Sequence, residues 1–255
     1  MRDAGMVLLI PAYNEAARLE GDAFLAFLDR HPDAAIRFVD DGSTDDTAGV
    51  LDRLAAARPA QLAVQRLGTN RGKAEAVREG MITALAEGAA LVGFADADLA
   101  APLDEAVRLR DELAAHPEAW AAIGSRVRLL GRDIVRSPLR HYLGRVFATA
   151  ASLTLALPVY DTQCGLKLFR NIAPVRRALE APFASRWIFD VELLARLAAE
   201  AGEPAEPRFR EVPLERWSDR HGSRLRARDF PLAPLQLLAI RRQRRRARTP
   251  PAPAP

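Results

Sequence analysis

Two acidic side chains follow an apolar run in the first half of the chain. Asp96 and Asp98, here called the acidic pair, come directly after residues 91–95. A buried strand that ends in two carboxylates places both at the carboxyl edge of a sheet, where open α/β sheets bind ligands. Two hard oxygen donors suit Mg²⁺ or Mn²⁺, an ion usually shared with substrate phosphates. Because Asp is also common in turns and helix caps, this metal site depends on its surroundings for support.

Polar groups also follow the first two apolar runs of the chain. Pro11, Tyr13 and Glu15 come after the first run, and Asp40 and Asp41 come after the second. If both runs are parallel strands, these side chains emerge at the edge that carries the acidic pair. A carboxylate there can accept a hydrogen bond from a base N–H or a ribose hydroxyl. The residues after Asp41 could also cap a helix, and the two roles are compatible.

Two cations stand where a helix is predicted to begin. Segment 70–73 reads Asn-Arg-Gly-Lys and carries Arg71 and Lys73. The backbone N–H groups and the dipole at a helix N-terminus favour anions. These groups could hold a phosphate, although the segment taken alone is more typical of a flexible surface turn.

Three carboxylates in the second half are further candidates. A reaction that takes a proton from a substrate hydroxyl needs a general base. Asp161, Asp190 or Glu192 could take that role. Asp190 and Glu192 lie at a predicted helix start, where the helix dipole alone favours negative charge.

Other kinds of site find little support. The four histidines lack metal-ligand spacing, and Cys164 has no evident histidine partner, so we expect it to be a packed side chain. The P-loop, Gly-x-Ser-x-Gly and Gly-x-Gly-x-x-Gly signatures are absent, which removes the usual support for a kinase, a hydrolase or a dinucleotide-binding protein.

Alternating strands and helices must position these groups. The apolar and helical patterns predict strands at 7–10, 36–39, 62–64, 91–95, 121–124, 164–169 and 209–213, and helices at 15–30, 44–57, 71–87, 102–115, 139–157 and 188–201. This order predicts an α/β fold with a mixed, mostly parallel central sheet and helices on both faces. We expect one domain over residues 1–230, with a nucleotide-binding half (1–100) and an acceptor half (101–230).

The positive charge of the chain is concentrated near its C-terminus. The net charge is +4, yet six arginines lie between Arg241 and Arg248, so the remainder is slightly acidic and is not expected to bind nucleic acid. Residues 231–255 are predicted to form a basic helix and a disordered Pro/Ala tail. Apolar residues leading into arginines suit an anionic membrane surface. A solvated terminal helix, or a nucleic-acid contact by the tail, is the alternative.

The composition indicates a soluble protein of a reducing compartment. The 255 residues are 49% hydrophobic and 27% charged, as in soluble globular domains. A single cysteine fits a reducing compartment. No signal peptide is evident, and no apolar stretch reaches the roughly 20 residues that span a bilayer. We expect a cytoplasmic protein that is peripheral at the cytoplasmic face of the membrane.

Taken in order, these segments resemble the family 2 inverting glycosyltransferases, which have the nucleotide-sugar-binding GT-A fold. The resemblance covers roughly residues 6–240 and rests on the blocks IPAYNE, VDDGSTDDT, NRGKAEAVREGM, FADADL, GSR, DTQCGLKLF, RWIFDVELL and HGSRL. Within the family, the chain looks most like the dolichyl- and polyprenyl-phosphate β-glucosyltransferases, and second like the dolichyl-phosphate mannose synthases.

The resemblance implies roles for individual residues. Asp98 would be the principal metal ligand, and Asp96 would lie near the ribose and the metal. Lys73 and Arg126 would help to hold the diphosphate or the acceptor phosphate. The residues expected to act in catalysis are Asp98, Asp161, Arg126 and Asp190. Those expected to bind the nucleotide sugar are Pro11, Tyr13, Glu15, Asp40 or Asp41, Lys73, Asp96, Gln163 and Arg224, the last on a mobile loop over the phosphates.

One position departs from the pattern of the family. Some mannose synthases carry a Gln two residues after the second Asp as an extra metal ligand, whereas this chain has Ala100. Phosphate or water ligands would have to complete the coordination shell.

The expected function is therefore the metal-dependent transfer of a hexose to polyprenyl phosphate, with UDP-glucose as the first donor considered and a GDP-hexose as the second. Mg²⁺ or Mn²⁺, together with Lys and Arg, would stabilise the leaving diphosphate. An acceptor phosphate is already ionised and needs no strong base. The alternatives are a glycosyltransferase with a soluble hydroxyl acceptor, a sugar-nucleotide nucleotidyltransferase, and a non-catalytic protein that binds a membrane or an anion through its arginine tail.

Overall fold

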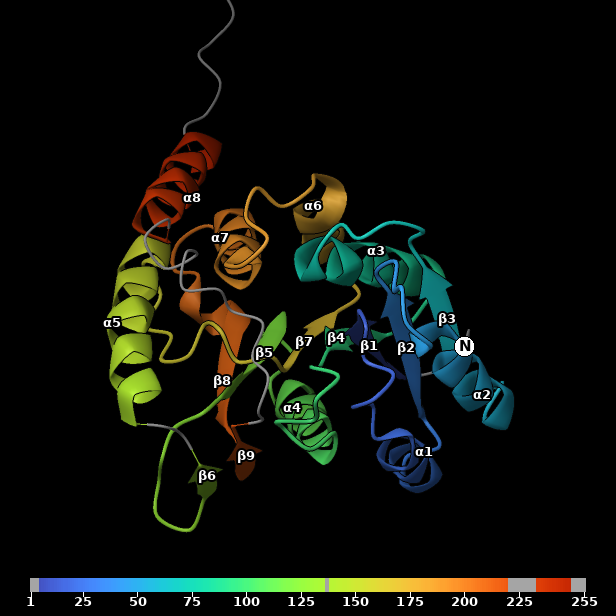
Figure 1. Cartoon of the computed structure of the whole chain (residues 1–255). Helices are drawn as coiled ribbons and strands as arrows, with labels where there is room; N and C mark the ends of the chain where they lie inside the picture. Colours follow the sequence, from blue (N-terminus) through green and yellow to red (C-terminus); the bar gives the residue numbers. More distant parts are fainter. Residues whose placement is uncertain (1–4, 136–137, 220–232, 249–255) are drawn as a thin grey trace, which may run out of the picture.

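A computed structural model of the chain describes residues 5–135, 138–219 and 233–248. Within these residues, seven strands form a central sheet in the order β3-β2-β1-β4-β7-β5-β8 (Figure 1). The strands are β1 (Met6–Ala12), β2 (Ala34–Asp40), β3 (Leu62–Arg66), β4 (Leu91–Phe94), β5 (Ala121–Ser125), β7 (Lys167–Arg170) and β8 (Phe209–Pro213). A separate parallel pair consists of β6 (Asp133–Val135) and β9 (Arg216–Ser218).

The direction of β7 decides which residues can meet. The pairs β1–β2, β1–β4, β2–β3 and β5–β8 are parallel, whereas β7 is antiparallel to both β4 and β5. The first residue of β7, Lys167, is therefore the partner of Phe94, the last residue of β4. As a result, the segment before β7 lies at the edge where the parallel strands end. The expected mixed, mostly parallel sheet is confirmed.

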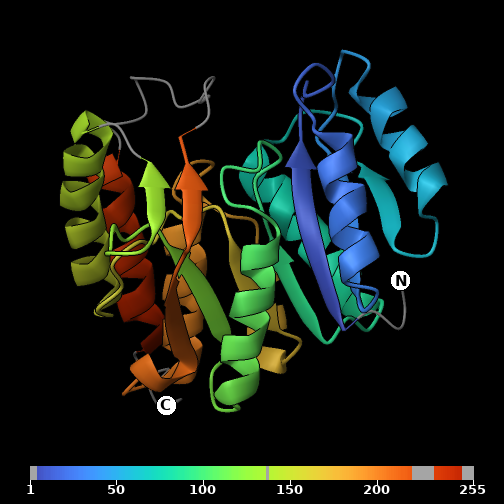
Figure 2. The same ribbon diagram turned by 90° about the horizontal axis from the view of Figure 1, so that it is seen from below.

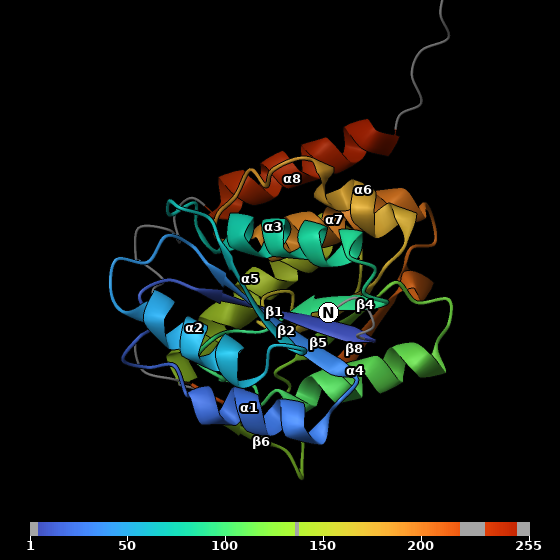
Figure 3. The ribbon, with the colours of Figure 1, turned by 90° about the vertical axis from the view of Figure 1, so that its right-hand side faces the viewer.

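Helices cover both faces of the sheet, as expected (Figures 1 and 3). One face carries α1 (Gly21–Arg30), α2 (Thr47–Ala57) and α4 (Asp104–Ala115), and the other carries α3 (Lys73–Ala86), α6 (Ala173–Glu180) and α7 (Phe189–Ala201). Side chains alternate along β1 between the two cores: Met6 and Leu8 pack with the first set of helices, and Val7 and Leu9 with the second. This alternation buries the strand on both sides, which explains its continuous apolar run.

Two long helices lie beside the second half of the sheet. These are α5 (Pro138–Leu155) and α8 (Ala233–Arg248), which run side by side in the view from below (Figure 2). They form a third core with α7, in which Ala151 and Leu155 of α5 and Leu237 and Ile240 of α8 are buried. No helix in the described ranges has both the length and the apolar character needed to cross a membrane.

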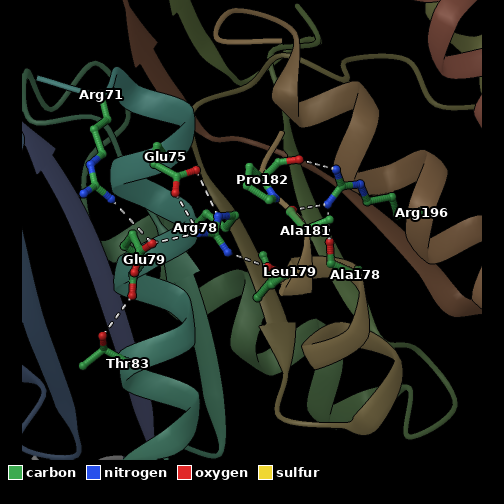
Figure 4. A network of polar contacts seen from close by, with 10 residues as sticks. All are labelled: Arg71, Glu75, Arg78, Glu79, Thr83, Ala178, Leu179, Ala181, Pro182 and Arg196. Carbon is green, nitrogen blue, oxygen red and sulfur yellow. Dashed lines mark hydrogen bonds and ion pairs between the residues drawn. The ribbon is translucent and has the colours of Figure 1, made fainter. Parts of the chain in front are cut away.

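A polar network ties α3 to the end of α6, and ties α7 to the same end of α6 and the residues that follow it (Figure 4). The buried Arg78 of α3 donates hydrogen bonds to the Glu75 carboxylate and, at 2.9 Å, to the Leu179 carbonyl. From α7, Arg196 donates to the carbonyls of Ala178 and Pro182. The helix that begins at Lys73 is thus fixed relative to the helix that carries Asp190.

Several predicted boundaries are wrong for identifiable reasons. The first helix begins at Gly21 instead of residue 15, because the Glu15 carbonyl accepts the N–H groups of Arg18 and Leu19 in a local turn. The second begins at Thr47, after a turn in which the Asp40 carboxylate accepts the Ser43 N–H. The strand predicted from residue 164 begins at Lys167. The elements β6, β9, α6 and the 3₁₀ turn Glu206–Arg208 were not predicted.

Candidate active site

The carboxyl end of β4 releases the acidic pair into a site lined by three other segments. One carboxylate oxygen of Asp96, Oδ1, accepts a hydrogen bond from Lys73 Nζ, and the two side chains form an ion pair. The other oxygen, Oδ2, lies against Gly165 in the segment before β7. A Cβ atom built at Gly165 would overlap the Asp96 carboxylate, so any side chain there would require Asp96 to move. The Asp96 carboxylate is therefore held between a cation and a glycine.

Asp98 lies partly buried beside Asp96. Its Oδ1 accepts the Ala100 N–H at 3.1 Å, in a local turn. Burial raises the pKa of Asp98 above the ordinary value of 3.8, and the charges of Asp96 and Glu15 raise it further, while the Ala100 N–H and Lys73 oppose the shift. Negative charge therefore accumulates at this point, which favours a bound cation.

The acidic pair fits a divalent cation only in part. Both side chains are carboxylates, the donors that Mg²⁺ and Mn²⁺ prefer. Within the described segments, however, no group of three or more His, Cys, Asp or Glu side chains is arranged to hold a metal ion. Ala100 adds no ligand, as the sequence indicated. Protein ligands from these segments would have to be supplemented by phosphate oxygens or water.

Beneath the acidic pair lies a buried ion pair that the sequence did not reveal. Lys167 is fully buried, and its Nζ donates to Asp190 Oδ1 at 3.0 Å and to the Cys164 carbonyl. Burial raises the pKa of Asp190, and the charges of Lys167 and Lys73 oppose the increase. Lys73 is affected in turn: burial lowers its pKa, but the carboxylates of Asp96 and Asp190 raise it by more in total. Lys73 is thus an ammonium ion that interacts with both carboxylates.

A second cation is clamped at the end of β5. Arg126 donates from Nε to Asp161 Oδ2 at 2.6 Å and from an Nη to Asp161 Oδ1 at 2.8 Å, a bidentate pair. Burial lowers the pKa of Arg126, but the Asp161 charge and these hydrogen bonds outweigh it, so the pKa stays above its ordinary value. The Glu211 carboxylate fixes the segment by accepting the N–H groups of Tyr160 and Asp161.

Two buried hydroxyls flank this clamp. Ser125 Oγ and Thr162 Oγ1 have no hydrogen-bond partner among the residues that the structure covers. A buried polar group without a partner costs about 1–3 kcal/mol. Such costs are often tolerated at functional sites.

Asp41 binds the turn that precedes α3. Its two carboxylate oxygens accept the N–H groups of Arg71 and Gly72, each at 2.7 Å. Burial raises the pKa of Asp41, and these two N–H donors oppose the shift. The sequence suggested that a phosphate would take the backbone N–H groups of this segment, which is wrong for these two, because Asp41 already occupies them. The Lys73 side chain remains directed to the acidic pair.

The remaining sequence candidates lie as follows. Pro11 lies near the end of β1, and Tyr13 lies in the turn that follows. Glu15 pairs with Arg18 at 2.7 Å. Asp40 lies at the end of β2, buried beside Asp41, and Gln163 donates its N–H to Asp161 Oδ1. Arg224 lies outside the described residues.

Glu192 belongs to the scaffold. It pairs with Arg196 at 2.7 Å and accepts the N–H groups of Ala184 and Ser185. These contacts account for its burial in the fold and direct it to the segment before α7.

Gly165, Lys167 and Arg186 were missed by sequence reasoning. The side chain of Arg186 lies over Gly72, with its Cδ 3.4 Å from a Cβ built there, and its charge acts on Asp41. A lysine within an apolar strand pattern, as in Cys-Gly-Leu-Lys-Leu-Phe, is a signal that could have identified Lys167, because a buried lysine needs a carboxylate partner.

Solved structures similar to this one include two sugar transferases. A mannosyltransferase from Pyrobaculum calidifontis, in complex with GDP-Man and Mn²⁺, is 22% identical with a TM-score of 0.61, covering 98% of this chain and 66% of that one. Glucosyl-3-phosphoglycerate synthase from Mycobacterium tuberculosis, in complex with Mn²⁺ and UDP-glucose, is 21% identical with a TM-score of 0.64, covering 94% and 79%. These similarities define the GT-A glycosyltransferase fold.

The family follows from the sequence comparison. The model described as "Glycosyl transferase family 2" matches residues 7–173, and the chain belongs to this family, a family of enzymes. Dolichyl-phosphate β-glucosyltransferases of Drosophila melanogaster and Trichomonas vaginalis are 36% and 32% identical over 86% of this chain. A polyprenol monophosphomannose synthase of Mycolicibacterium smegmatis is 28% identical over 73% of it. The chain spans 65% of the Trichomonas protein and 68% of the Drosophila protein, about two thirds of their length.

Proposed function

We propose that this protein transfers a hexose, glucose from UDP-glucose in the first place, to a polyprenyl or dolichyl phosphate. The observation that carries the proposal is the meeting of the acidic pair, Lys73 and Arg126 at one sheet edge, in a chain that resembles dolichyl-phosphate β-glucosyltransferases over most of its length. Two carboxylates and two cations suit a nucleotide diphosphate bound with a divalent cation.

Asp98, assisted by Asp96, would hold Mg²⁺ or Mn²⁺, and phosphate oxygens of the donor would complete the shell. When bound, the ion would neutralise the charge that develops on the leaving diphosphate. Lys73 would stabilise the same charge from the side of α3. The nucleoside would lie over the ends of β1 and β2, where Pro11, Tyr13, Glu15 and Asp40 or Asp41 line the edge.

The acceptor would enter beside Arg126, whose guanidinium is available to a phosphate at the cost of part of its contact with Asp161. Gln163, and Arg224 from outside the described residues, are also proposed for the sugar and acceptor side. An acceptor phosphate is ionised at neutral pH and attacks without transfer of a proton to the enzyme. A reaction without a general base agrees with the pairing of the nearby carboxylates, each of which is held by a cation.

The hydroxyl-acceptor alternative is less well supported. It requires a general base that can reach the acceptor and take a proton. Each of the three carboxylates considered for that role is buried and paired: Asp161 with Arg126, Asp190 with Lys167 and Glu192 with Arg196. Each of these carboxylates would have to leave its cation before it could reach an acceptor hydroxyl.

The lipid acceptor would be met at a membrane surface. Exposed apolar side chains occur on α5, at Val146 and Leu153, and on α8, at Leu235 and Leu238. The arginines that begin at Arg241 continue α8, and Arg241 and Arg242 are exposed. Apolar and cationic groups on neighbouring helices suit an anionic membrane surface, at its cytoplasmic face.

The decisive experiment is a transfer assay with the purified protein. UDP-glucose labelled in the sugar is incubated with polyprenyl phosphate and Mn²⁺, and GDP-mannose is tested in parallel. We expect labelled lipid from UDP-glucose, a loss of at least about 100-fold in Asp98→Asn, and little change in Asp46→Asn, an exposed aspartate outside the site. Failure of every UDP- and GDP-hexose to label the lipid would refute the proposal. Release of pyrophosphate from a sugar phosphate and UTP would identify the nucleotidyltransferase alternative.

A further inference from the structure

Lys73 pairs with a carboxylate that a bound divalent cation would also need. Its ammonium group pairs with Asp96, one of the two carboxylates proposed to face the metal, and both side chains are little more than one third exposed (39% and 37%). Asp98 also contributes to the charge that surrounds Lys73. An ammonium and a divalent cation repel each other strongly at such short range. A divalent cation that binds the acidic pair therefore competes with Lys73 for Asp96.

The structure offers Lys73 a second carboxylate. Asp190 acts on the Lys73 ammonium from below, where its own position is fixed by the buried Lys167. The backbone around Lys73 is also fixed, because Asp41 binds the turn before α3 and Arg78 ties α3 to the end of α6. An exchange between the two carboxylates therefore requires only a movement of the flexible lysine side chain.

We propose that Lys73 is the resident counter-ion of Asp96 in the ligand-free protein, and that the divalent cation of the donor complex displaces it toward Asp190. This inference rests on the metal-bound donor of the proposed function. Lys167 is then a positioning residue, which keeps Asp190 in place to receive the ammonium. Because the metal ion must displace Lys73, the site binds a metal ion weakly when no nucleotide is present. The metal binds well when the diphosphate arrives with it, because the phosphates then attract the displaced ammonium.

The test measures Mn²⁺ affinity without nucleotide, by the electron paramagnetic resonance signal of free Mn²⁺. Lys73→Met should bind Mn²⁺ about fivefold more tightly than the wild type, since an ion pair of this exposure is worth up to about that factor. Lys73→Arg, which keeps the charge, should stay close to the wild type. The matched control is Arg71→Met, which removes a cation from the same turn that faces Glu79 at 4.0 Å instead of Asp96. It should change Mn²⁺ affinity less than about twofold.

A double-mutant cycle tests the second position. Asp190→Asn is combined with Lys167→Met, because removing both charges of a buried pair is tolerated better than removing one. In the presence of Lys73, this change should weaken Mn²⁺ binding, since the ammonium has lost its other carboxylate. In the Lys73→Met background it should have no effect. An equal weakening in both backgrounds would show that Asp190 acts on the metal directly and would overturn the exchange.

The outcomes separate this inference from the proposed function. If Lys73→Met gains no Mn²⁺ affinity, or shows no binding, the exchange is wrong even when the wild type transfers glucose to the lipid. Suppose that Lys73→Met binds Mn²⁺ more tightly and that Asp190→Asn/Lys167→Met weakens Mn²⁺ binding only when Lys73 is present. If the wild type then labels no lipid, the exchange stands and the proposed transfer reaction is wrong.

Discussion

Gly165 is the residue whose small size the acidic pair requires. A methyl group at this position would overlap Asp96 Oδ2. We predict that Gly165→Ala lowers the affinity for UDP in the presence of Mn²⁺ by at least about tenfold, because the Asp96 carboxylate must move from the position beside Asp98 in which it is proposed to face the metal. Calorimetric titration with UDP and Mn²⁺ measures the change.

A second glycine provides the control for this substitution. Gly5 lies at the opposite end of β1, where a Cβ would make an ordinary contact of 3.7 Å with the Asp33 carbonyl. Gly5→Ala should therefore leave UDP affinity unaffected. Equal affinities in Gly165→Ala and the wild type would mean that Asp96 does not need its present position to bind the donor.

Asp98 is predicted to destabilise the ligand-free protein. Its pKa is raised by burial and by the charge of Asp96, so the folded state binds the proton more tightly than the unfolded state, whose value is near 3.8. Ionised Asp98 therefore costs stability at neutral pH, and the cost vanishes below pH 3.8, where both states are protonated. With a chelator present, Asp98→Asn should unfold at a higher temperature than the wild type at pH 7. The difference should shrink as the pH falls toward 3.8.

Asp45 supplies the comparison of opposite sign. Hydrogen bonding to the Thr47 hydroxyl and N–H lowers the pKa of this exposed carboxylate. Its ionised form stabilises the fold above the unfolded pKa, so Asp45→Asn should lower the unfolding temperature at pH 7. If both variants shift in the same direction, the burial and charge of Asp98 do not govern its contribution.

At the scale of elements, the turn before α3 depends on a residue from another strand end. Asp41 accepts two backbone N–H groups of that turn and is almost fully buried. Asp41→Ala leaves both donors without a partner, and we predict a loss of about 2 kcal/mol in the free energy of unfolding. UDP affinity should fall as well, because Lys73 is the first residue of the helix that the turn presents.

The exposed Asp46 is the matched control, since its contact is a 3.4 Å pair with Arg53 at the surface. Asp46→Ala should change stability by less than about 0.5 kcal/mol. Denaturant unfolding followed by UDP titration distinguishes the two variants. Unchanged UDP affinity in Asp41→Ala would contradict a role of this turn in placing Lys73.

The elements also show how far the sequence could predict the site. The apolar runs of β1, β2 and β4 predicted parallel strands, and their last residues predicted where Asp40, Asp41 and the acidic pair would meet. The strand at Lys167–Arg170 was expected, but a short apolar run does not reveal its direction. Because β7 runs antiparallel, Gly165 and Lys167 come to the edge of the sheet. Contacts of this kind depend on pairing between distant strands, which single-sequence patterns do not encode.

At the scale of the whole molecule, the helices α5 and α8 carry the exposed apolar side chains that are proposed to meet a membrane. Leu237 and Ile240 of α8 face the third core, whereas Leu235 and Leu238 are exposed. We predict that the double substitution Leu235→Ser/Leu238→Ser weakens binding to vesicles containing anionic lipid by about tenfold. Each exposed leucine would bury part of its apolar surface in the lipid interface. Vesicle sedimentation of the full chain measures this binding.

Transfer to a lipid acceptor should follow the same surface. With vesicle-embedded polyprenyl phosphate, the double variant should lose transfer in proportion to its lost binding, while UDP affinity stays unchanged because the site residues are untouched. Ile82→Ser is the matched control, since Ile82 is an exposed apolar residue that belongs to α3 and to neither α5 nor α8. Raising the salt concentration should weaken vesicle binding of the wild type, because the attraction of Arg241 and Arg242 to anionic lipid is screened. Equal sedimentation of the double variant, Ile82→Ser and the wild type would exclude these leucines from the membrane contact and would leave the arginine segment as the part of α8 to test next.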